Sequence, residues 1–335
     1  MTKTKIAING FGRIGRAFFK LAAQRSELEI VAINDLGEKA NLEYLLKYDS
    51  VYGKTGEGIL KQFQNAEFLQ EKDPRNLPWG DLGIDVVVES TGVFESYEKA
   101  KVHLDAGAKR VVISAPVKDN PEDAGVVGAT VLMGVNDGAL KTCQISSNAS
   151  CTTNAGSPVV GILDETIGIE KAMLNTVHGY TATQSVVDGP SKKDPRKGRA
   201  AAVNIIPTST GAAIATTKAL TQLAGKFDGI ALRVPVPAGS IADITFIAKR
   251  ETTVEEVNEA LTSAAGNARW SNVFAVTNEP LVSTDIIGDT HASIVDLSMT
   301  RVVGGNLVKV LAWYDNEVGY ANTLVEHVLA TASHI

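Results

Sequence analysis

The 335-residue chain has only two cysteines, no excess of positive charge and no apolar run long enough to span a bilayer. Cys143 and Cys151 form neither a disulfide framework nor a CxxC pair, so we expect a reducing, cytoplasmic location. The formal net charge of -6 gives no basic footprint, which argues against nucleic acid or an anionic membrane as the main partner. The N-terminal MTKTKIAINGFG passes directly into an apparent strand and lacks the apolar core of a signal peptide.

Length and hydrophobic patterning predict two domains of different class. In the first half, apolar strands alternate with helices, which is typical of a parallel sheet with helices on its faces. The strands are expected at 5–9, 29–34, 84–90 and 109–115, and the helices at 13–25 and 95–107. After Cys151 the strands follow one another with fewer helices between them, which indicates an α+β domain with a largely antiparallel sheet. Its strands are expected near 171–178, 228–234, 241–248 and 306–314, with helices after Cys151, near 253–265 and over 317–332.

A glycine-rich turn at residues 10–15 is the first functional motif. GFGRIG is a GxGxxG that follows a predicted strand and opens a predicted helix, and Asp35 ends the next strand 20 residues after Gly15. The glycines, Gly10, Gly12 and Gly15, would let the backbone approach a pyrophosphate at the helix N-terminus. Asp35 would bind the adenosine ribose and repel a 2′-phosphate, which favours NAD over NADP. The alternative is an ordinary glycine-rich turn beside a surface aspartate.

The second motif is SNASCTTN, residues 147–154, which precedes an apolar helical pattern. Serine and asparagine are favoured at helix N-caps, so Cys151 is expected in the first turn, where the helix dipole would lower the pKa of its thiol. A buried, inert thiol is the alternative, and it fits Cys143 better than Cys151 because the neighbours of Cys151 are polar.

Histidines and basic residues are less informative by pattern alone. His178 ends an apolar strand, and there a structural role and a catalytic role both stay open. The remaining four are expected on the surface or on helices: His103, His291, His327 and His334. No HExxH or Cys/His spacing favours a metal site. Hydroxyls, arginines and a helix start of the kind that binds phosphate are scattered over 181–233. From pattern alone, a solvated basic loop is the favoured interpretation of 191–199.

Ten segments together resemble the glyceraldehyde-3-phosphate dehydrogenase family almost end to end. They are INGFGRIGR (8–16), LLKYDSVYG (45–53), ESTGVF (89–94), ISAP (113–116), MGVN (133–136), SNASCTTN (147–154), TVHGYTATQ (176–184), PTSTGAA (207–213), RVPVP (233–237) and WYDNEVGY (313–320). The resemblance implies a Rossmann-type dinucleotide-binding domain over 1–150 and a catalytic domain over 151–315. The C-terminal helix, 316–335, would pack back on the first domain.

The resemblance also implies roles for particular residues. Cys151 is similar to the family's nucleophile and His178 to the histidine that activates it. Cofactor contacts would come from Arg13, Ile14, Asp35, Lys72, Ser114 and Asn316. The substrate phosphate and inorganic phosphate would be held by Ser150, Thr152, Thr181, Arg199, Thr210, Gly211 and Arg233. The implied reaction oxidises and phosphorylates glyceraldehyde 3-phosphate with NAD in a homotetramer, in which segment 181–201 lines a neighbouring subunit's cofactor site.

Four departures from the family pattern stand out. The second cysteine that commonly follows SNASCTTN is absent, Lys72 replaces an arginine near the adenine, Ala155-Gly156-Ser157 replaces a bulkier run, and 117–131 diverges. Two rival functions stay open: erythrose-4-phosphate dehydrogenase, which hydrolyses its thioester, and a non-catalytic NAD- or RNA-binding relative.

Overall fold

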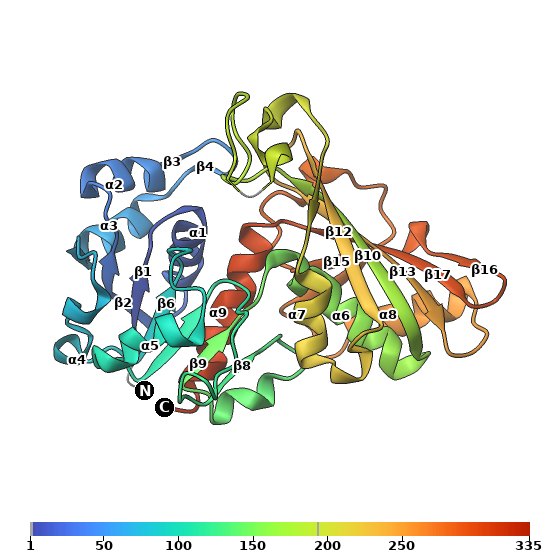
Figure 1. Cartoon of the computed structure of the whole chain (residues 1–335), viewed down its shortest axis with the longest axis horizontal. Coiled ribbons are helices and arrows are strands. Elements are labelled where there is room, and N and C mark those ends of the chain that lie inside the picture. Colours follow the sequence, from blue (N-terminus) through green and yellow to red (C-terminus); the bar gives the residue numbers. More distant parts are fainter. Residues whose placement is uncertain (1–2, 193) are drawn as a thin grey trace. The chain divides into compact units, whose positions relative to one another are not determined.

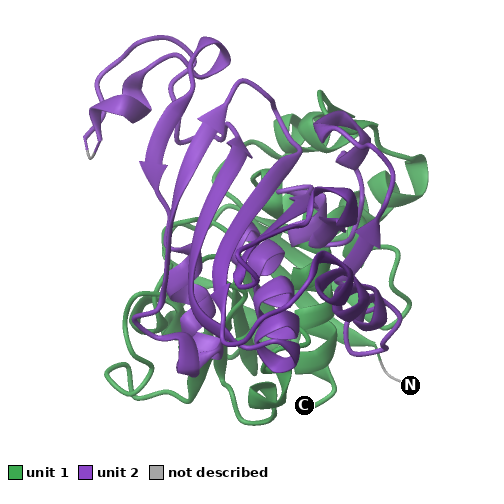
Figure 2. Cartoon of the chain, turned by 90° about the vertical axis from the view of Figure 1, so that its right-hand side faces the viewer, with its two compact units in different colours: residues 1–150, 321–335 green, residues 151–320 purple. Residues whose placement is uncertain are grey.

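The computed structural model describes residues 3–192 and 194–335. Residues 1 and 2, which precede the first predicted strand, and Lys193 of the predicted basic loop lie outside the described residues. The chain divides into two compact units, residues 1–150 with 321–335 and residues 151–320 (Figure 2). No helix among the described residues combines the length and the apolar character needed to cross a membrane.

A seven-stranded parallel sheet forms the centre of the first unit, in the order β5-β2-β1-β6-β7-β9-β8 (Figure 1). Its strands are β1 (Thr4–Asn9), β2 (Leu28–Asn34), β5 (Glu67–Leu69), β6 (Val86–Glu89), β7 (Arg110–Ile113), β8 (Gly128–Thr130) and β9 (Ile145–Ser147). The chain builds outward from β1 in both directions, so the strand order reverses between β1 and β6. Such a reversal opens a crevice at the carboxyl ends of the strands, where nucleotides bind. The predicted Rossmann-type sheet is confirmed.

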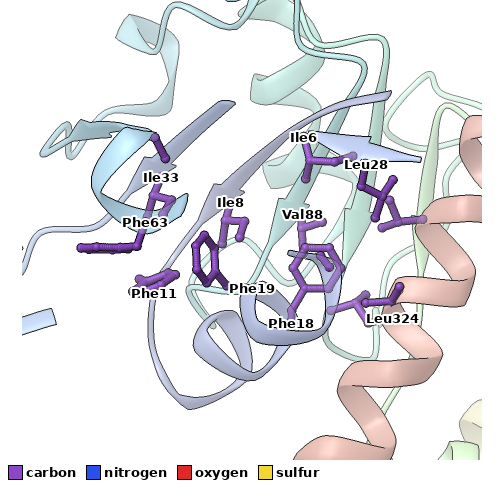
Figure 3. Close-up of a cluster of buried hydrophobic side chains, with 14 of the residues drawn as sticks. Ile6, Ile8, Phe11, Phe18, Phe19, Leu28, Ile33, Phe63, Val88 and Leu324 are labelled. Carbon is purple, nitrogen blue, oxygen red and sulfur yellow. The ribbon is translucent and has the colours of Figure 1, made fainter. Parts of the chain in front are cut away.

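Helices pack around this sheet, together with a short hairpin of β3 (Tyr48–Asp49) and β4 (Gly53–Lys54). They are α1 (Arg13–Ala22), α2 (Lys39–Lys47), α3 (Glu57–Asn65), α4 (Trp79–Leu82), α5 (Tyr97–Asp105) and the later part of α9 (Val318–Ala332), with 3-10 turns η1 (Pro74–Asn76) and η2 (Asp137–Lys141). Phe18 and Phe19 of α1 are fully buried against Ile6 and Ile8 of β1 (Figure 3). We call this group the phenylalanine cluster, and Leu324 of α9 belongs to it. The apolar face of α9 therefore contributes to the core of the first unit.

The second unit contains an eight-stranded sheet in the order β11-β12-β10-β13-β17-β15-β14, with β16 paired to β17. Its strands are β10 (Ile169–Gly179), β11 (Ile206–Ser209), β12 (Phe227–Val234), β13 (Ser240–Ala248), β14 (Phe274–Thr277), β15 (Ser293–Asp296), β16 (Arg301–Val303) and β17 (Leu307–Tyr314). Among the described strands of this sheet, only β10–β12 and β14–β15 pair in parallel. The predicted largely antiparallel sheet is confirmed.

One face of this second sheet is covered by helices and the other is open. The helices are α6 (Cys151–Thr166), α7 (Ala212–Ala219) and α8 (Val254–Ala265), and 3-10 turns occur at η3 (Pro195–Gly198), η4 (Ala201–Val203), η5 (Thr221–Leu223), η6 (Ser283–Ile286) and η7 (Leu297–Met299). Along β13, residues alternate strictly between buried and half-buried. Ile244 faces Gly156 of α6, whereas Ile241 and Ile247 lie on the opposite, half-buried face.

Each predicted helix and strand is present within a few residues of its predicted bounds, and α1 ends three residues early, at Ala22. The elements that the pattern did not predict are mostly short, such as β5, β8 and β9. The divergent segment 117–131 holds turns over 121–125 and then β8.

Candidate active site

A sharp turn carries the chain from β9 into α6. Ala149 has φ 53°, and it is the one non-glycine residue with positive φ among the described residues. Its backbone N–H donates to Ser147 Oγ at 3.0 Å, which stabilises this unfavourable conformation. The helix begins two residues later at Cys151, in agreement with the predicted helix start.

Polar contacts from α9 hold the same turn within the first unit. Asn148 is fully buried; its Oδ1 lies 3.1 Å from His327 Nδ1, and its Nδ2 donates to Thr323 Oγ1 at 3.1 Å. His327 Nε2 lies 2.7 Å from Ser146 Oγ. Because the amide oxygen can only accept, Nδ1 carries the proton and Nε2 accepts from the serine. Burial lowers the pKa of His327 to about 3, so the ring is neutral.

A thiol and an imidazole meet in the second unit. Cys151 Sγ, at the start of α6, lies 3.3 Å from His178 Nε2, near the end of β10. Cys151 is half-buried and His178 is 2% exposed. The sequence alone left the partner of Cys151 open, and β10 brings His178 to it. A thiol within hydrogen-bond distance of a ring nitrogen can transfer its proton and become a nucleophile.

The electrostatics differ from the sequence-based expectation. Burial raises the pKa of the Cys151 thiol, an effect that the charge of Arg233 and hydrogen bonds with Thr152 oppose without reversing. Burial, and secondly Arg233, lower the pKa of His178 to about 3. The prediction of a lowered thiol pKa at the helix start is therefore wrong for this structure, because loss of solvent outweighs the favourable helix position.

Tyr314 is a buried member of the site to which sequence reasoning gave no role. Its hydroxyl lies 2.9 Å from Thr152 Oγ1 and 2.7 Å from Thr176 Oγ1, and its ring packs edge-on against His178 at 5.9 Å. The hydroxyl therefore links α6, β10 and β17. The sequence did contain a signal for this role, because Tyr314 is an aromatic residue with a hydroxyl at the end of the predicted strand 306–314.

Asn316 lies beside the same strand ends. Its Oδ1 accepts from Ser240 Oγ at 2.8 Å, and Ser240 Oγ in turn accepts from Gly179 N–H at 3.1 Å. The residue is 4% exposed. Its amide is thus fixed next to the residue that follows His178.

Strand register separates the predicted phosphate residues into two groups. Arg233 pairs beside His178, and Thr181 follows the same end of β10. Thr181 N–H donates to Gln184 Oε1 at 3.0 Å. Thr210 and Gly211 instead follow Ser209, whose partner Ile230 lies three residues from Arg233 on β12. These two residues directly precede α7, and Thr210 Oγ1 accepts from Ala212 N–H at 3.2 Å.

The other predicted phosphate residues have different surroundings. Arg199 is exposed and its Nε pairs with Asp188 at 2.9 Å. Thr152 directs its hydroxyl at Tyr314. Ser150 is half-buried and directly precedes the nucleophile.

The glycine-rich turn has the form that a dinucleotide needs. Gly10 has φ 95°, and a Cβ there would come within 2.6 Å of Thr91 N. A Cβ on Gly15 would overlap the carbonyl oxygen of Gly10, whereas one on Gly12 would enter open space. Gly12 is the N-cap of α1 and has no side chain to bond the first N–H groups. The turn therefore leaves room for a ligand at a helix N-terminus that has no side-chain cap.

Asp35 is held against this turn. Its Oδ2 accepts from Phe11 N–H at 2.6 Å and its Oδ1 from Gly37 N–H at 2.8 Å. Arg13 pairs with Asp49 at 3.3 Å, and Ile14 packs against the phenylalanine cluster.

The two remaining predicted cofactor contacts lie in loops after strands. Ser114 is half-buried after β7, and Lys72 is exposed in the loop after β5.

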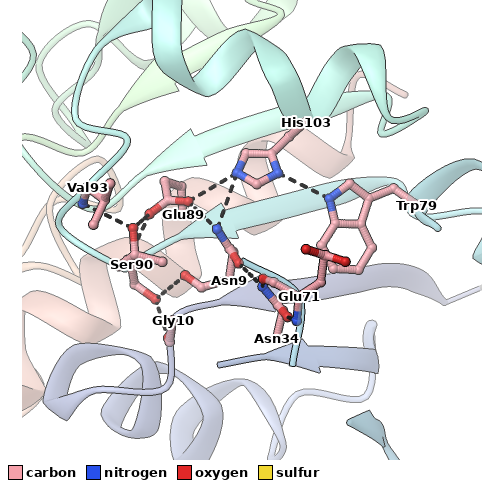
Figure 4. A network of polar contacts seen from close by, with 10 residues as sticks. Asn9, Gly10, Asn34, Glu71, Trp79, Glu89, Ser90, Val93 and His103 are labelled. Carbon is pink, nitrogen blue, oxygen red and sulfur yellow. Dashed lines mark hydrogen bonds and ion pairs between the residues drawn. The ribbon is translucent and has the colours of Figure 1, made fainter. Parts of the chain in front are cut away.

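A buried polar network lies beneath the turn at the ends of β1, β2 and β6 (Figure 4). Glu89 accepts from Asn9 Nδ2 at 2.6 Å and from Thr91 N–H at 2.7 Å, and lies 3.0 Å from His103 Nε2. Trp79 Nε1 donates to His103 Nδ1 at 3.1 Å, so Nε2 is the protonated ring nitrogen. The network fixes the strand ends from which Gly10 and Thr91 continue.

Two of the four additional histidines lie on helices, as the sequence analysis allowed: His103 in α5 and His327 in α9. Both are 0% exposed and hydrogen-bonded. A helical pattern alone does not show which polar residue faces the core. No cluster of three or more potential metal ligands occurs in residues 3–192 and 194–335, and the expectation of no metal stays a prediction.

A Rossmann-type sheet with an open glycine turn, and a separate thiol–imidazole pair, are together typical of a nicotinamide-dependent dehydrogenase that works through cysteine. Residues 4–97 match the family model "Glyceraldehyde 3-phosphate dehydrogenase, NAD binding domain", and residues 150–316 match the model of its C-terminal domain. The chain belongs to the glyceraldehyde-3-phosphate dehydrogenase family. The predicted family, NAD as cofactor and dehydrogenase class are confirmed.

Similar proteins cover almost the whole chain. Glyceraldehyde-3-phosphate dehydrogenase 1 of Streptomyces avermitilis is 48% identical over 335 residues, covering 97% of both chains. Glyceraldehyde-3-phosphate dehydrogenase 1 of Kluyveromyces lactis is 46% identical, covering 97% of this chain and 99% of its own. The protein of that name from Mycolicibacterium smegmatis is 46% identical, covering 97% of both chains.

Proposed function

We propose that this chain converts glyceraldehyde 3-phosphate and inorganic phosphate to 1,3-bisphosphoglycerate with reduction of NAD, as a step of glycolysis and gluconeogenesis. The observation that carries the proposal is the 3.3 Å approach of Cys151 Sγ and His178 Nε2 at the start of α6. The family supplies the substrate class, and the thiol and imidazole supply the chemistry.

The first unit fits a dinucleotide. Gly10 and Gly15 leave no space for a Cβ, while the backbone at Gly12 is open to a ligand. We assign Gly10, Gly12, Arg13, Ile14 and Gly15 to the pyrophosphate side of the site. Asp35 would accept from the ribose hydroxyls with the lone pairs left beside its two backbone donors. Ser114, Lys72 and Asn316 complete the proposed cofactor set.

The reaction begins with proton transfer from Cys151 to His178 and attack of sulfur on the aldehyde carbon, which gives a thiohemiacetal. Conversion of this adduct to a thioester requires loss of a hydride, for which NAD would be the acceptor when bound. His178 Nε2 and the Cys151 backbone N–H stabilise the oxyanion that develops at the carbonyl. Cys151 then holds the acyl group until phosphate oxygen attacks the thioester carbon and the thiolate leaves.

Two anion sites are needed because one phosphate arrives on the substrate and another as nucleophile. The register-separated groups support this proposal: Arg233 with Thr181 forms one, and Thr210 with Gly211 forms the other, where the N-terminus of α7 presents backbone donors. We assign Ser150, Thr152 and Arg199 to the same phosphate-binding set.

The decisive experiment measures NADH formation from glyceraldehyde 3-phosphate with and without inorganic phosphate, with NAD and NADP side by side. The proposal predicts a rate that requires phosphate and prefers NAD. Cys151→Ser and His178→Asn should lose most of this rate. Cys143→Ser is the matched control, since that thiol is buried in the first unit and should leave the rate unchanged.

Each rival predicts a different result in the same assay. Oxidation that proceeds equally without phosphate, and faster with erythrose 4-phosphate, would identify the erythrose enzyme. NAD binding without turnover would identify a non-catalytic relative. Full activity in Cys151→Ser would exclude the covalent mechanism.

We also propose a cytoplasmic homotetramer with a dinucleotide-binding domain over 1–150 and a catalytic domain over 151–315. Apolar side chains in and after segment 181–201 support the assembly: Val186, Val187 and Val203 are 74% to 86% exposed. Such exposure is typical of an interface rather than of a monomer surface. Light scattering should give four times the chain mass, and Val186→Asp with Val203→Asp should reduce it.

A further inference from the structure

A chain of buried side-chain amides leads to Glu89 beneath the strand ends of the first unit (Figure 4). Asn34 Oδ1 accepts from Glu71 N–H at 2.9 Å, which fixes the orientation of this amide, and its Nδ2 donates to Asn9 Oδ1 at 2.7 Å. Asn9 therefore presents its own Nδ2 to Glu89 Oε2, at 2.6 Å. One backbone N–H thus determines the direction of both side-chain hydrogen bonds between β2 and Glu89.

The Glu89 carboxylate receives donors at both oxygens. Thr91 N–H and Thr91 Oγ1 donate to Oε1 at 2.7 and 2.5 Å. Asn9 Nδ2 and His103 Nε2 donate to Oε2 at 2.6 and 3.0 Å. A carboxylate has about four lone-pair sites, and these four donors fill them, whereas a carboxylic acid would direct its O–H at one of the donors. The network therefore requires Glu89 to be ionised.

Trp79 prevents His103 from acting as the counter-ion of this carboxylate. The indole Nε1 can only donate, and it lies 3.1 Å from His103 Nδ1. An imidazolium would place its Nδ1–H directly against the indole N–H, so the ring is neutral. His103 is the only ion-pair partner of Glu89 within residues 3–192 and 194–335, and the side chain of Glu89 is 1% exposed. The network therefore carries one buried net negative charge.

This charge lies on the side of β1 that is opposite to Asp35. The strand that leads to Asp35, β2, pairs with one edge of β1, and β6, which ends at Glu89, pairs with the other edge. With the adenosine ribose at Asp35 and the pyrophosphate at the glycine-rich turn after β1, the nicotinamide half of the cofactor would lie over the carboxyl end of β6. Adjacent strands are about 4.8 Å apart, so Glu89 is one strand from the pyrophosphate, toward the nicotinamide.

We propose that Glu89 is a specificity-determining residue for the oxidation state of the cofactor: its buried negative charge favours NAD, whose nicotinamide ring is cationic, over NADH, whose ring is neutral. This inference rests on the proposed placement of the adenosine ribose at Asp35. The pyrophosphate is the same in both forms, so its repulsion by Glu89 cancels when the two affinities are compared. Because protein shields the carboxylate from solvent and salt, its field reaches a ring that it does not contact.

A purely structural role of Glu89 predicts a different pattern of binding. Glu89 also holds Thr91 against the glycine-rich turn, where a Cβ on Gly10 would come within 2.6 Å of Thr91 N. Disturbing this contact would weaken NAD and NADH by the same factor. The ratio of the two dissociation constants therefore reports the charge, and ADP-ribose, which lacks the nicotinamide ring, reports the shape of the rest of the site.

The test measures Kd for NAD, NADH and ADP-ribose by titration calorimetry in the full-length parent and in Glu89→Gln, which removes the charge at nearly constant size. We expect the ratio of the NADH Kd to the NAD Kd to fall about five- to tenfold in this variant. His103→Gln is the matched control, because a glutamine can accept from Trp79 and donate to Glu89 and so leaves the charge in place. Its ratio should equal that of the parent, even if all three Kd values rise. An unchanged ratio in Glu89→Gln, or an equal fall in His103→Gln, would overturn the proposal.

Trp79→Phe provides a second test in case Glu89→Gln does not fold. Without the indole N–H, His103 Nδ1 can take a proton, and the imidazolium would neutralise the network. Within the described part of the chain, Glu89 is the one titratable group in contact with the ring, and the other contacts, Asn9 and Phe94, are uncharged. Between pH 8 and pH 6 the ratio should fall in Trp79→Phe relative to the parent at the same pH. The same pH dependence in both proteins would contradict the proposal.

Failure of the proposed function gives different results in these experiments. If Asp35 does not hold the adenosine ribose, Asp35→Asn leaves the Kd for ADP-ribose unchanged, whatever the ratio does in Glu89→Gln. A ratio that depends on Glu89 in a chain without turnover rejects the proposed reaction alone. Phosphate-dependent turnover with an unchanged ratio rejects this inference alone.

Discussion

Gly15 packs against Gly10 so closely that a methyl group on Gly15 would overlap the carbonyl oxygen of Gly10. We expect Gly15→Ala to push α1 away from β1, to lower stability by about 1–3 kcal/mol and to abolish NAD binding. Gly12→Ala provides the comparison, since its Cβ enters open space where the ligand would approach. It should keep the parental Tm but bind NAD more weakly. Calorimetry measures both Tm and the Kd for NAD. An unchanged Kd in Gly15→Ala would contradict this account of the turn.

Gly156 lies inside α6 where the family pattern carries bulkier residues. A Cβ at this position would meet Ile244 Cδ1 at 3.8 Å, an ordinary contact distance. Since glycine in a helix interior costs about 1 kcal/mol relative to alanine, Gly156→Ala should raise stability by about 0.5–1 kcal/mol and raise Tm by a few degrees. Scanning calorimetry checks the shift. A lower Tm would mean that β13 leaves no room for the added methyl group.

Tyr314 connects the nucleophile's helix to the central strands through Thr152 and Thr176. Tyr314→Phe leaves two buried hydroxyls without this partner, at a cost of about 1–3 kcal/mol. Because Thr152 is in the first turn of α6, we expect kcat to fall while KM for NAD stays unchanged. Steady-state kinetics and urea unfolding separate the two effects. A normal kcat in a destabilised variant would restrict Tyr314 to a structural role.

His327 should make stability depend on pH. Its folded pKa is lowered to about 3, so between about pH 6.5 and 3 the unfolded chain binds a proton that the folded chain does not. Stability present above pH 6.5 is therefore lost as the pH falls, by about 1.4 kcal/mol per unit for this group. His327→Gln should lose about 2 kcal/mol less than the parent between pH 6.5 and 5. Parallel stability curves from urea unfolding would disprove this contribution.

The sequence predicted helices and strands well where a single local pattern determines them. Apolar patterning predicted β10, β13 and β17, and polar N-cap residues predicted the start of α6 at Cys151. Burial of particular polar residues was not predictable. His103 and His327 have the same local pattern as exposed helix residues, and only their distant partners, Glu89 and Asn148, make burial favourable.

The sequence-based prediction that the pKa of the Cys151 thiol is lowered was wrong for a related reason. The helix start is visible in the sequence, whereas the loss of solvent around the thiol depends on Tyr314 and His178, which other strands supply. The position of Arg233 beside His178 also depends on strand pairing, since 55 residues separate the two in the chain.

The turn before Cys151 is completed by residues that are synthesised much later. Asn148 and His327 are 179 positions apart, and the whole second unit lies between them in the sequence. During translation the strands of residues 1–150 leave the ribosome first, yet Leu324 of the phenylalanine cluster and the ring that holds Asn148 follow only after residue 320. The nascent chain therefore carries an unfinished hydrophobic core and an unanchored nucleophile turn until α9 emerges. Chaperone binding and thiol damage are accordingly expected to concentrate in that interval.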